Sequence, residues 1–323
     1  MAVRIGVIGA GTMSGKYHCP SLVALRRPKV TLEAICDLDE AKAKKHARRF
    51  GFKHVYTSMS EMFATARLDG VCVFTPINAT APVATEVMRA GLPVYMEKPP
   101  GATLLEANGL ARTAEKMGVP SMVAFNRRYV PALVEAKRRA EELGPVTYVE
   151  AVQLRSQRLE PRFVRGTALH VIDAVRHLAG DVVRVKSEKR RSPREKTNIW
   201  MATLDFASGA IGRILIKPHA GCNVERYVLS SPDYTVFAAG GLDWLADYPG
   251  LLEVHVGGKK IRSKIPAKRV KVDDHVYWCG FYSEMAEFVA ALSEGRAPRP
   301  SVAEAVQSVK LAAMIDTGKS GTL

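Results

Sequence analysis

Two short segments of this 323-residue chain combine residue types that can carry chemistry. Gly9 and Gly11 stand in a Gly-Ala-Gly-Thr-Met-Ser turn, whose backbone N–H groups can hold a negatively charged pyrophosphate at the start of a helix. Lys98 stands in the tripeptide Glu97-Lys98-Pro99, just after an apolar run. A lysine at the floor of a pocket can donate a hydrogen bond to a substrate oxygen and stabilise charge as it develops. The turn indicates a bound cofactor, and the lysine indicates catalysis.

The glycine-rich turn has the strand, turn and helix order of a dinucleotide-binding fold. Val3–Ile8 is predicted as a buried strand, Gly9 as the tight turn and Gly11 as the point where the backbone approaches a pyrophosphate. The third glycine position holds Ser14. Taken alone, this pattern is equally compatible with an ordinary turn.

Asp37 adds context to the glycine-rich turn, because it ends a second predicted strand, Val30–Cys36. An acid at this place can accept hydrogen bonds from the adenosine ribose hydroxyls. The same carboxylate would repel a 2′-phosphate, and no arginine or serine follows it directly. The sequence therefore favours NAD, with NADP as the alternative. The other interpretation of Asp37 is a cap for the helix that begins near Asp39.

The pattern of elements predicts two kinds of sheet. Strand and helix patterns alternate up to about residue 125, as in a parallel sheet with crossover helices. After Gly144-Pro145 successive strand patterns follow, which indicates a largely antiparallel sheet. The predicted fold class is α/β, with an N-terminal Rossmann doubly wound parallel sheet and a C-terminal α+β domain that has a largely antiparallel open sheet. We expect the domains at 1–122 and 123–323.

Individual elements are expected at definite ranges. In the first domain the predicted strands are 3–8, 30–36, 71–74, 93–96 and 120–125, and the predicted helices are 39–50, 82–90 and 103–116. In the second domain the predicted strands are 146–154, 197–206, 210–217, 224–230 and 251–256. Two helices, 281–292 and 302–315, are predicted after them.

The formal net charge of +15 raises the question of a polyanionic partner. The basic run Lys186–Arg194 has no interleaved aromatic residues, which favours a solvated surface over a nucleic-acid site. Four arginines stand shortly before a candidate catalytic segment, His170–Asp173, in the sequence. They are Arg155, Arg158, Arg162 and Arg165. We expect them to attract a carboxylate or phosphate on a substrate.

Other site classes have little support in the composition. The five cysteines are scattered and have no C-x-x-C spacing, and the eight histidines show no ligand spacing, so we expect free thiols and no metal site. No apolar run of about 18 residues and no signal-peptide pattern occurs, so no membrane partner and a cytoplasmic location are expected.

Several motifs stand along the chain in a fixed order. They are Gly9-Ala10-Gly11 with Lys16-Tyr17-His18 and Pro20, Asp37, Thr75-Pro76-Ile77-Asn78, Glu97-Lys98-Pro99, Asn126-Arg127, His170-Val171-Ile172-Asp173, and Gly280-Phe281 with Glu284 and Phe288. In this order they resemble the Gfo/Idh/MocA family of oxidoreductases, named for glucose-fructose oxidoreductase and inositol dehydrogenase. The resemblance covers nearly the whole chain.

This resemblance implies roles for individual residues. In the family the lysine of the E-K-P motif lies between nicotinamide and substrate, and a histidine on a helix of the second domain commonly acts as acid or base. These roles fall on Lys98 and His170. The residues expected to contact the cofactor are Gly9, Gly11, Thr12, Met13, Asp37, Thr75, Pro76, Asn78, Glu97 and Lys98. The residues expected to contact the substrate are Lys98, Asn126, Arg127, Arg155, Asp173 and His170.

Two positions depart from the family pattern. Gly166 stands where many members place an aspartate four residues before the histidine, and Ala81 replaces a histidine that often follows the T-P-x-N turn. Asp173, three residues after His170, can share its helix face or support the helix instead.

The sequence thus predicts an NAD(P)-dependent dehydrogenase that acts on the CH-OH group of a sugar, inositol or related polyol, with or without an anionic group. A non-catalytic dinucleotide-binding regulatory protein of the same fold and a reductase of an imine or conjugated substrate are the alternatives. Homodimers or homotetramers are expected. The exact substrate, the direction of reaction and the choice between NAD and NADP are left open.

Overall fold

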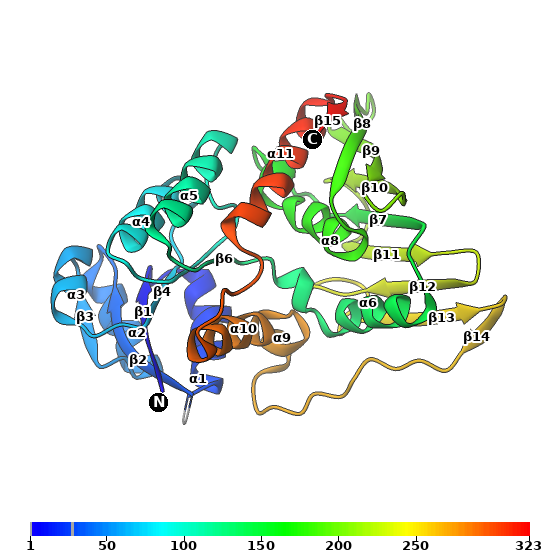
Figure 1. Ribbon diagram of the computed structural model, residues 1–323. Coiled ribbons are helices and arrows are strands. Elements are labelled where there is room, and N and C mark those ends of the chain that lie inside the picture. Colours follow the sequence, from blue (N-terminus) through cyan, green and yellow to red (C-terminus); the bar gives the residue numbers. More distant parts are fainter. Residues whose placement is uncertain (1, 27–28) are drawn as a thin grey trace. The chain divides into compact units, whose positions relative to one another are not determined.

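The computed structural model describes residues 2–26 and 29–323, and these form two compact units (Figure 1). Unit 1 comprises Met1–Ala124, Val270–Val276 and Phe281–Val306, and unit 2 comprises Phe125–Arg269, Tyr277–Gly280 and Gln307–Leu323. The division at 122/123 expected from the sequence did not include this return of the chain to unit 1.

Unit 1 contains a parallel sheet in the order β3-β2-β1-β4-β5-β6 among the described residues. Its strands are β1 (Val3–Ile8), β2 (Val30–Cys36), β3 (His54–Tyr56), β4 (Gly70–Val73), β5 (Val94–Met96) and β6 (Ser121–Val123). The β1 and β2 bounds are those predicted, because each is a mostly apolar and buried run of the kind that a sheet covered on both faces requires.

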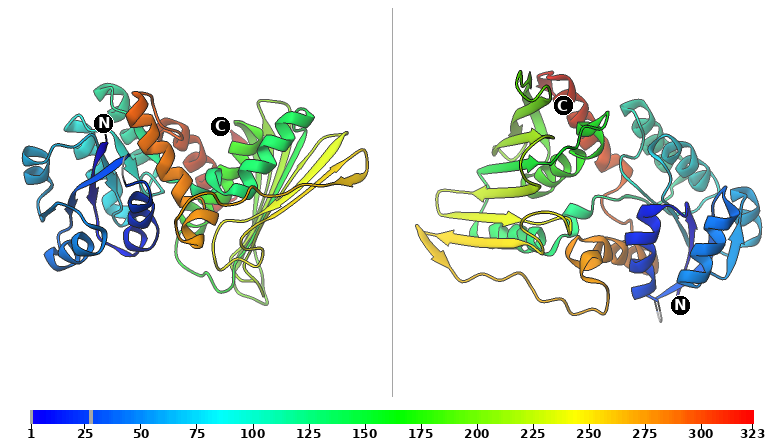
Figure 2. Two further views of the ribbon diagram at one scale, coloured as in Figure 1. Left: turned by 90° about the horizontal axis from the view of Figure 1, so that it is seen from below. Right: turned by 180° about the vertical axis from the view of Figure 1, so that it is seen from behind.

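Helices lie on both faces of this sheet, with α1 beside α10 on one face and α4 beside α5 on the other (Figures 1 and 2). Local signals fix several ends. Asp39 caps α2 by accepting from the Lys42 N–H, and a capping box of Thr103 and Glu106 begins α5. The helical elements of unit 1 are η1 (Ser14–His18), α1 (Cys19–Ala24), α2 (Glu40–Phe50), α3 (Met59–Thr65), α4 (Ile77–Arg89), α5 (Leu104–Met117) and α10 (Phe281–Glu294).

The prediction that the fourth of these helices begins at Pro82 is wrong, because α4 begins at Ile77 with Pro82 inside it. A proline there removes one helical hydrogen bond. The buried face of the helix nevertheless continues on both sides of Pro82, through Thr80, Ala81 and Ala84. Packing of this face outweighs the local preference of proline for the first turn.

Unit 2 contains a sheet in the order β14-β13-β12-β11-β7-β10-β9-β8-β15 within the described part of the chain. Its neighbouring strands are antiparallel except for the parallel pair of β7 and β10. The strands are β7 (Tyr148–Leu154), β8 (Val182–Arg191), β9 (Asn198–Phe206), β10 (Ile211–Lys217), β11 (Val224–Ser230), β12 (Tyr234–Ala239), β13 (Leu251–Val256), β14 (Lys259–Ile261) and β15 (Gly321–Thr322). The predicted fold class is therefore confirmed for both sheets.

Two longer helices pack on strands of this sheet. Helix α6 (Pro131–Leu143) packs on β12, and α8 (Leu169–Ala179) packs on β7. Besides α10 of unit 1, the other helical elements after residue 124 are η2 (Asn126–Tyr129), α7 (Phe163–Gly166), α9 (Asp274–Trp278) and α11 (Val302–Thr317). Within the described residues, none of the helices has both the length and the apolar character needed to span a bilayer.

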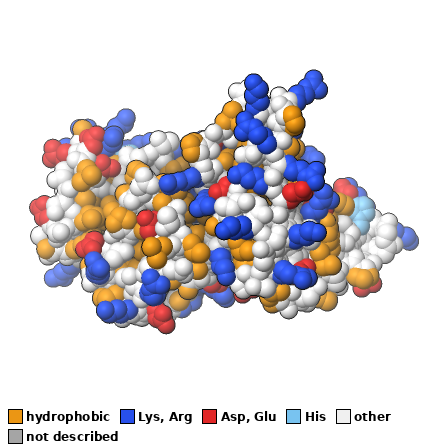
Figure 3. All heavy atoms as spheres, turned by 90° about the horizontal axis from the view of Figure 1, so that it is seen from above, with side chains coloured by type: hydrophobic (Ala, Val, Ile, Leu, Met, Phe, Trp, Pro, Cys, Tyr) orange, Lys and Arg blue, Asp and Glu red, His pale blue; other side chains and the backbone are white. Residues whose placement is uncertain are grey.

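The positive charge is distributed over many elements. Lys137, Arg138 and Arg139 on α6 form ion pairs with acidic residues of the same helix. On the face shown in Figure 3, Lys and Arg side chains lie singly and in small groups among apolar and acidic ones. This arrangement is typical of a solvated surface.

Candidate active site

The candidate site begins with the glycine-rich turn at the carboxyl end of β1. Gly9 has a φ of +102°, and a Cβ there would collide with the carbonyl oxygen of Phe74. A Cβ built on Gly11 meets no described atom within 4 Å. The turn therefore needs glycine at the first position for close strand packing and leaves open space over the second. These are the conditions under which a pyrophosphate can approach the backbone.

The helix after this turn opens with a π-helical segment, η1. Such segments are uncommon and occur often at functional sites. The wider turn carries Ser14 and His18 into the interior, where both are fully buried. Thr12 and Met13, which we expected to border a cofactor, are exposed at the mouth of the turn.

Asp37 lies directly beside the glycine-rich turn. One carboxylate oxygen accepts from the Ala10 N–H at 2.7 Å, and the other accepts from the Asp39 N–H at 2.9 Å. The cap of α2 is Asp39, so the interpretation of Asp37 as that cap is wrong. Each oxygen of Asp37 keeps a further lone pair, which a ribose hydroxyl can use.

The remaining cofactor candidates follow the neighbouring strands. Thr75 and Pro76 come after β4, and Asn78 stands in the first turn of α4. Because β2, β1, β4 and β5 are adjacent and parallel, the segments after them share one edge of the sheet. Ligands bind at the carboxyl edge of open α/β sheets, so this is the place where a dinucleotide is expected.

Glu97 and Lys98 follow β5 at this edge. The Glu97 carboxylate accepts from the Lys98 backbone N–H at 3.1 Å, and His18 Nε2 lies 2.7 Å from its other oxygen. Burial raises the pKa of Glu97, but the hydrogen bond from His18 and the electrostatic effects of His18 and Lys98 outweigh it, and the pKa is lowered. Glu97 is thus an ionised group held in a fixed place beside Lys98.

Sequence reasoning gave no individual role to His18, Tyr95 and Glu284, which are buried and linked to one another near Glu97. His18 stacks on Phe74, Tyr95 donates to Glu284 Oε2 at 2.8 Å, and the Tyr95 hydroxyl lies 3.5 Å from His18 Nδ1. The only sequence signal was the presence of His18 and Glu284 in the series of motifs.

In unit 2, His170 lies on α8 with its ring edge-on to Phe125 at a centroid distance of 6.5 Å. Asp173 lies one turn further along, is fully buried, and accepts from Arg128 at 2.7 and 2.8 Å and from Ser308 at 2.8 Å. The structure therefore places Asp173 in the packing of α8, the second of the two roles left open for it.

Three of the expected substrate residues lie in a buried polar cluster of unit 2. Arg127 and Arg155 both pair with Glu225, and Asn126 donates to the Cys279 carbonyl at 2.8 Å. Burial raises the pKa of Glu225, but the two guanidinium groups lower it far below its usual range. The side chains of Arg127 and Arg155 are 2% and 0% exposed. Both arginines thus take part in the packing of unit 2 through Glu225, and substrate contact by Arg127 and Arg155 stays a prediction.

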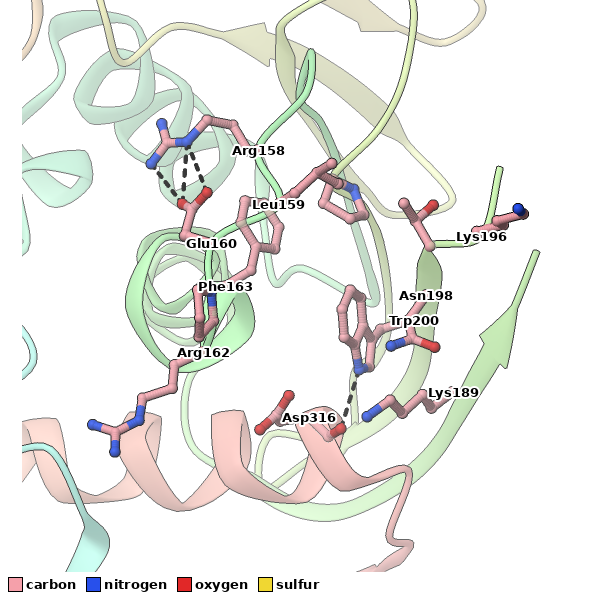
Figure 4. A pocket seen from close by; sticks show the side chains of 13 residues that line it. Arg158, Leu159, Glu160, Arg162, Phe163, Lys189, Lys196, Asn198, Trp200 and Asp316 are labelled. Atoms are coloured by element: carbon pink, nitrogen blue, oxygen red, sulfur yellow. Dashed lines mark hydrogen bonds and ion pairs between the residues drawn. The ribbon is translucent and has the colours of Figure 1, made fainter. Parts of the chain in front are cut away.

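The other arginines of the expected anion site do not converge. Arg158 pairs with Glu160 at 2.6 Å, and Arg165 pairs with Asp316 at 2.8 Å. Arg158 and Arg162 border a pocket of about 380 Å³ that Phe163 and Trp200 also line. Figure 4 shows the Arg158 guanidinium turned to Glu160 and Arg162 pointing away from Trp200. The structure gives no single place where the four arginines would meet an anion.

The two departures from the family pattern have different surroundings. Ala81 is buried on α4. A Cβ built on Gly166 meets no described atom within 4 Å, so the fold has room for a side chain to begin there. Among residues 2–26 and 29–323, no group of three His, Cys, Asp or Glu side chains is arranged to hold a metal ion.

Comparisons with known proteins decide the family. The model of an oxidoreductase family with an NAD-binding Rossmann fold, Gfo/Idh/MocA, matches residues 3–125. Inositol 2-dehydrogenase 1 of Saccharopolyspora erythraea is 30% identical over 271 residues, which cover 76% of this chain and 79% of that protein. The chain belongs to the Gfo/Idh/MocA family. This confirms the predicted resemblance, the oxidoreductase class and NAD as the family's cofactor.

Other Gfo/Idh/MocA relatives agree in fold and class. D-apiose dehydrogenase of Paraburkholderia graminis is 27% identical over 170 residues, 49% of this chain and 45% of that protein, so the match spans about half the length of this relative. An oxidoreductase from Agrobacterium radiobacter, solved with NAD+, L-tartaric acid and magnesium, has a TM-score of 0.84 over 100% of this chain and 98% of that chain. At 19% identity this last likeness concerns the fold alone.

Proposed function

We propose that this Gfo/Idh/MocA protein is an NAD-dependent dehydrogenase that transfers a hydride between nicotinamide and a secondary hydroxyl of a sugar, inositol or related polyol. The observation that carries the proposal is the edge of the unit 1 sheet. The glycine-rich turn, Asp37, the segment 75–78 and Lys98 follow four adjacent parallel strands and open at that edge. A cofactor site and a reactive cation are thus built into one surface.

Each candidate group has one task in this proposal. NAD supplies the hydride acceptor when it is bound. The Lys98 ammonium donates a hydrogen bond to the substrate oxygen and stabilises its developing negative charge. His170 removes the hydroxyl proton, since an imidazole can accept a proton near neutral pH. Lys98 belongs to unit 1 and His170 to unit 2, so their cooperation is the part that experiment must test.

The substrate class is supported by the names of the relatives. One is an inositol dehydrogenase and another a dehydrogenase of the sugar D-apiose. Both names denote oxidation of polyhydroxylated molecules. Arg155 and Arg158 are engaged by Glu225 and Glu160, which favours a neutral polyol over an anionic one. NADP as a second cofactor and a homodimer or homotetramer stay predictions.

The test is NADH formation across a panel of inositols, sugars and sugar acids. We expect Lys98→Ala and His170→Ala to lower kcat/KM by about 100-fold or more, the usual loss for an acid-base or charge-stabilising group. Lys137→Ala is the matched control, because it removes a partly exposed lysine that pairs with Glu141 on α6. If all three variants keep the activity of the wild type, the roles proposed for Lys98 and His170 are wrong. NAD binding without turnover of any substrate would favour the regulatory alternative. The sequence feature that raises this alternative is Gly166, which stands where many family members have an aspartate.

A further inference from the structure

A chain of hydrogen bonds runs through the core of unit 1 and ends at the Lys98 loop. Tyr95 donates to Glu284 Oε2 at 2.8 Å, and its hydroxyl lies 3.5 Å from His18 Nδ1. His18 Nε2 lies 2.7 Å from Glu97 Oε1, and Glu97 Oε2 accepts from the Lys98 N–H at 3.1 Å. Glu97 is thus bonded to His18 and to the Lys98 N–H, Tyr95 is bonded to Glu284, and the 3.5 Å approach of Tyr95 to His18 joins the two sets.

The aromatic surroundings fix the ring of His18. The ring is stacked on Phe74 at 4.1 Å with an interplanar angle of 9°, and it meets Phe281 edge-on at 5.4 Å. No part of the His18 side chain is exposed. These contacts fix the plane of the ring, and within this plane Nε2 faces Glu97 at 2.7 Å.

The hydrogen bond from His18 holds the Glu97 carboxylate in position. The Glu97 side chain is 12% exposed, and a carboxylate so nearly buried is costly without a donor. The titratable groups that face it are His18 from η1, Tyr95 from β5 and Lys98 of its own loop. Of these side chains, His18 makes the hydrogen bond with it, so loss of His18 would free Glu97 to move.

We propose that His18 is a positioning residue for Lys98, acting through Glu97, with Tyr95 and Glu284 as its support. The inference rests on the proposed function, in which the Lys98 ammonium contacts the substrate oxygen. A shift of about 1 Å in such a group can cost roughly 100-fold in rate, so a fixed loop matters for the chemical step.

Two substitutions at one position test the proposal. His18→Leu removes the ring nitrogens, and His18→Gln keeps an amide N–H where Nε2 stands. We expect kcat to fall by about 10-fold or more in His18→Leu while the Kd for NADH changes by less than about 2-fold, and we expect His18→Gln to regain most of the loss. A merely structural role would lower kcat equally in both variants. That result, or full activity in His18→Leu, would overturn the proposal.

A second measurement needs no substrate. Exchange of the Lys98 backbone amide should be about 10-fold faster in His18→Leu than in the wild type and near the wild-type rate in His18→Gln. Tyr234→Phe is the control, because it removes one hydroxyl bond to the Gly144 carbonyl in unit 2. If the wild type oxidises no polyol, the proposed function fails and this measurement still decides the hydrogen-bond chain, since unchanged exchange in His18→Leu would contradict it. If His18→Leu does not fold, Tyr95→Phe replaces it, with a smaller increase expected.

Discussion

At the scale of single residues, we expect Asp37 to select between NAD and NADP. Its carboxylate supports the glycine-rich turn through Ala10 and can also meet the ribose. We expect Asp37→Asn to keep a neutral acceptor but to lower the preference for NADH over NADPH by about 10-fold, equivalent to about 1.4 kcal/mol, because the repulsion of a 2′-phosphate is lost. Asp39→Ala is the control, since it removes the cap of α2 and the ion pair with Lys42 but leaves the contact between Asp37 and Ala10. Fluorescence titration measures both affinities, and an unchanged preference in Asp37→Asn would show that Asp37 does not select.

The sequence indicated which residues follow the strands at the carboxyl edge of the unit 1 sheet. It did not indicate which buried residues contact Glu97 and Tyr95. Gly9, Gly11, Asp37 and Lys98 could be expected at this edge because each stands within a few residues of the end of a predicted strand. The partner of Glu97 is 79 residues away in sequence, and the partner of Tyr95 is 189 residues away. No local pattern encodes such a pairing, because it depends on which strands and helices become neighbours. For the same reason the arginines of unit 2 were expected at a ligand although two of the four pair with acidic residues far away in sequence.

At the scale of elements, α8 carries a histidine that makes unit 2 sensitive to acid. Burial, with Arg128 and Lys137 nearby, lowers the pKa of His177 from 6.5 to about 4, while Asp173 and Glu141 oppose this. The unfolded chain therefore binds more protons between these values, so the free energy of unfolding falls as pH drops from 6.5 toward 4, by at most about 3 kcal/mol. Urea unfolding at several pH values measures this. His177→Gln should flatten the dependence, and the exposed His54→Gln should not; equal slopes in both variants would contradict the account.

The bounds of strands were predicted correctly where a strand-type run has clear ends in the sequence. The bounds of β1, β2, β11 and β13 are those predicted, since each is a strand-type run ended by turn residues or by a change of pattern. The basic run Lys186–Arg194 hid β8, whose exposed positions carry most of those charges. The charged residues of this run lie on the solvent-facing side of a strand. The sequence alone did not distinguish such a strand from a charged loop.

At the scale of the whole molecule, unit 1 is assembled from separate stretches of chain. A Cβ on Gly70 would lie 2.6 Å from Leu292, and Tyr95 bonds Glu284, so α10 is part of the same core as β4 and β5. We expect the fragment 1–122 to be unstable or aggregated, because it exposes the surface that α10 covers. Joining 281–306 to it through a flexible linker should restore a cooperative thermal transition in circular dichroism. A stable fragment 1–122 would show that α10 adds little.

The same split arrangement sets an order of events during biosynthesis. Translation delivers the chain from its amino end, and the strands of unit 2 from β7 to β14 leave the ribosome before α10 does. Glu284 therefore reaches Tyr95 only after the second sheet has been synthesised. The part of unit 1 that is synthesised first therefore keeps an uncovered apolar surface until α10 has been made. We expect unit 1 to bind a dinucleotide only near the end of synthesis.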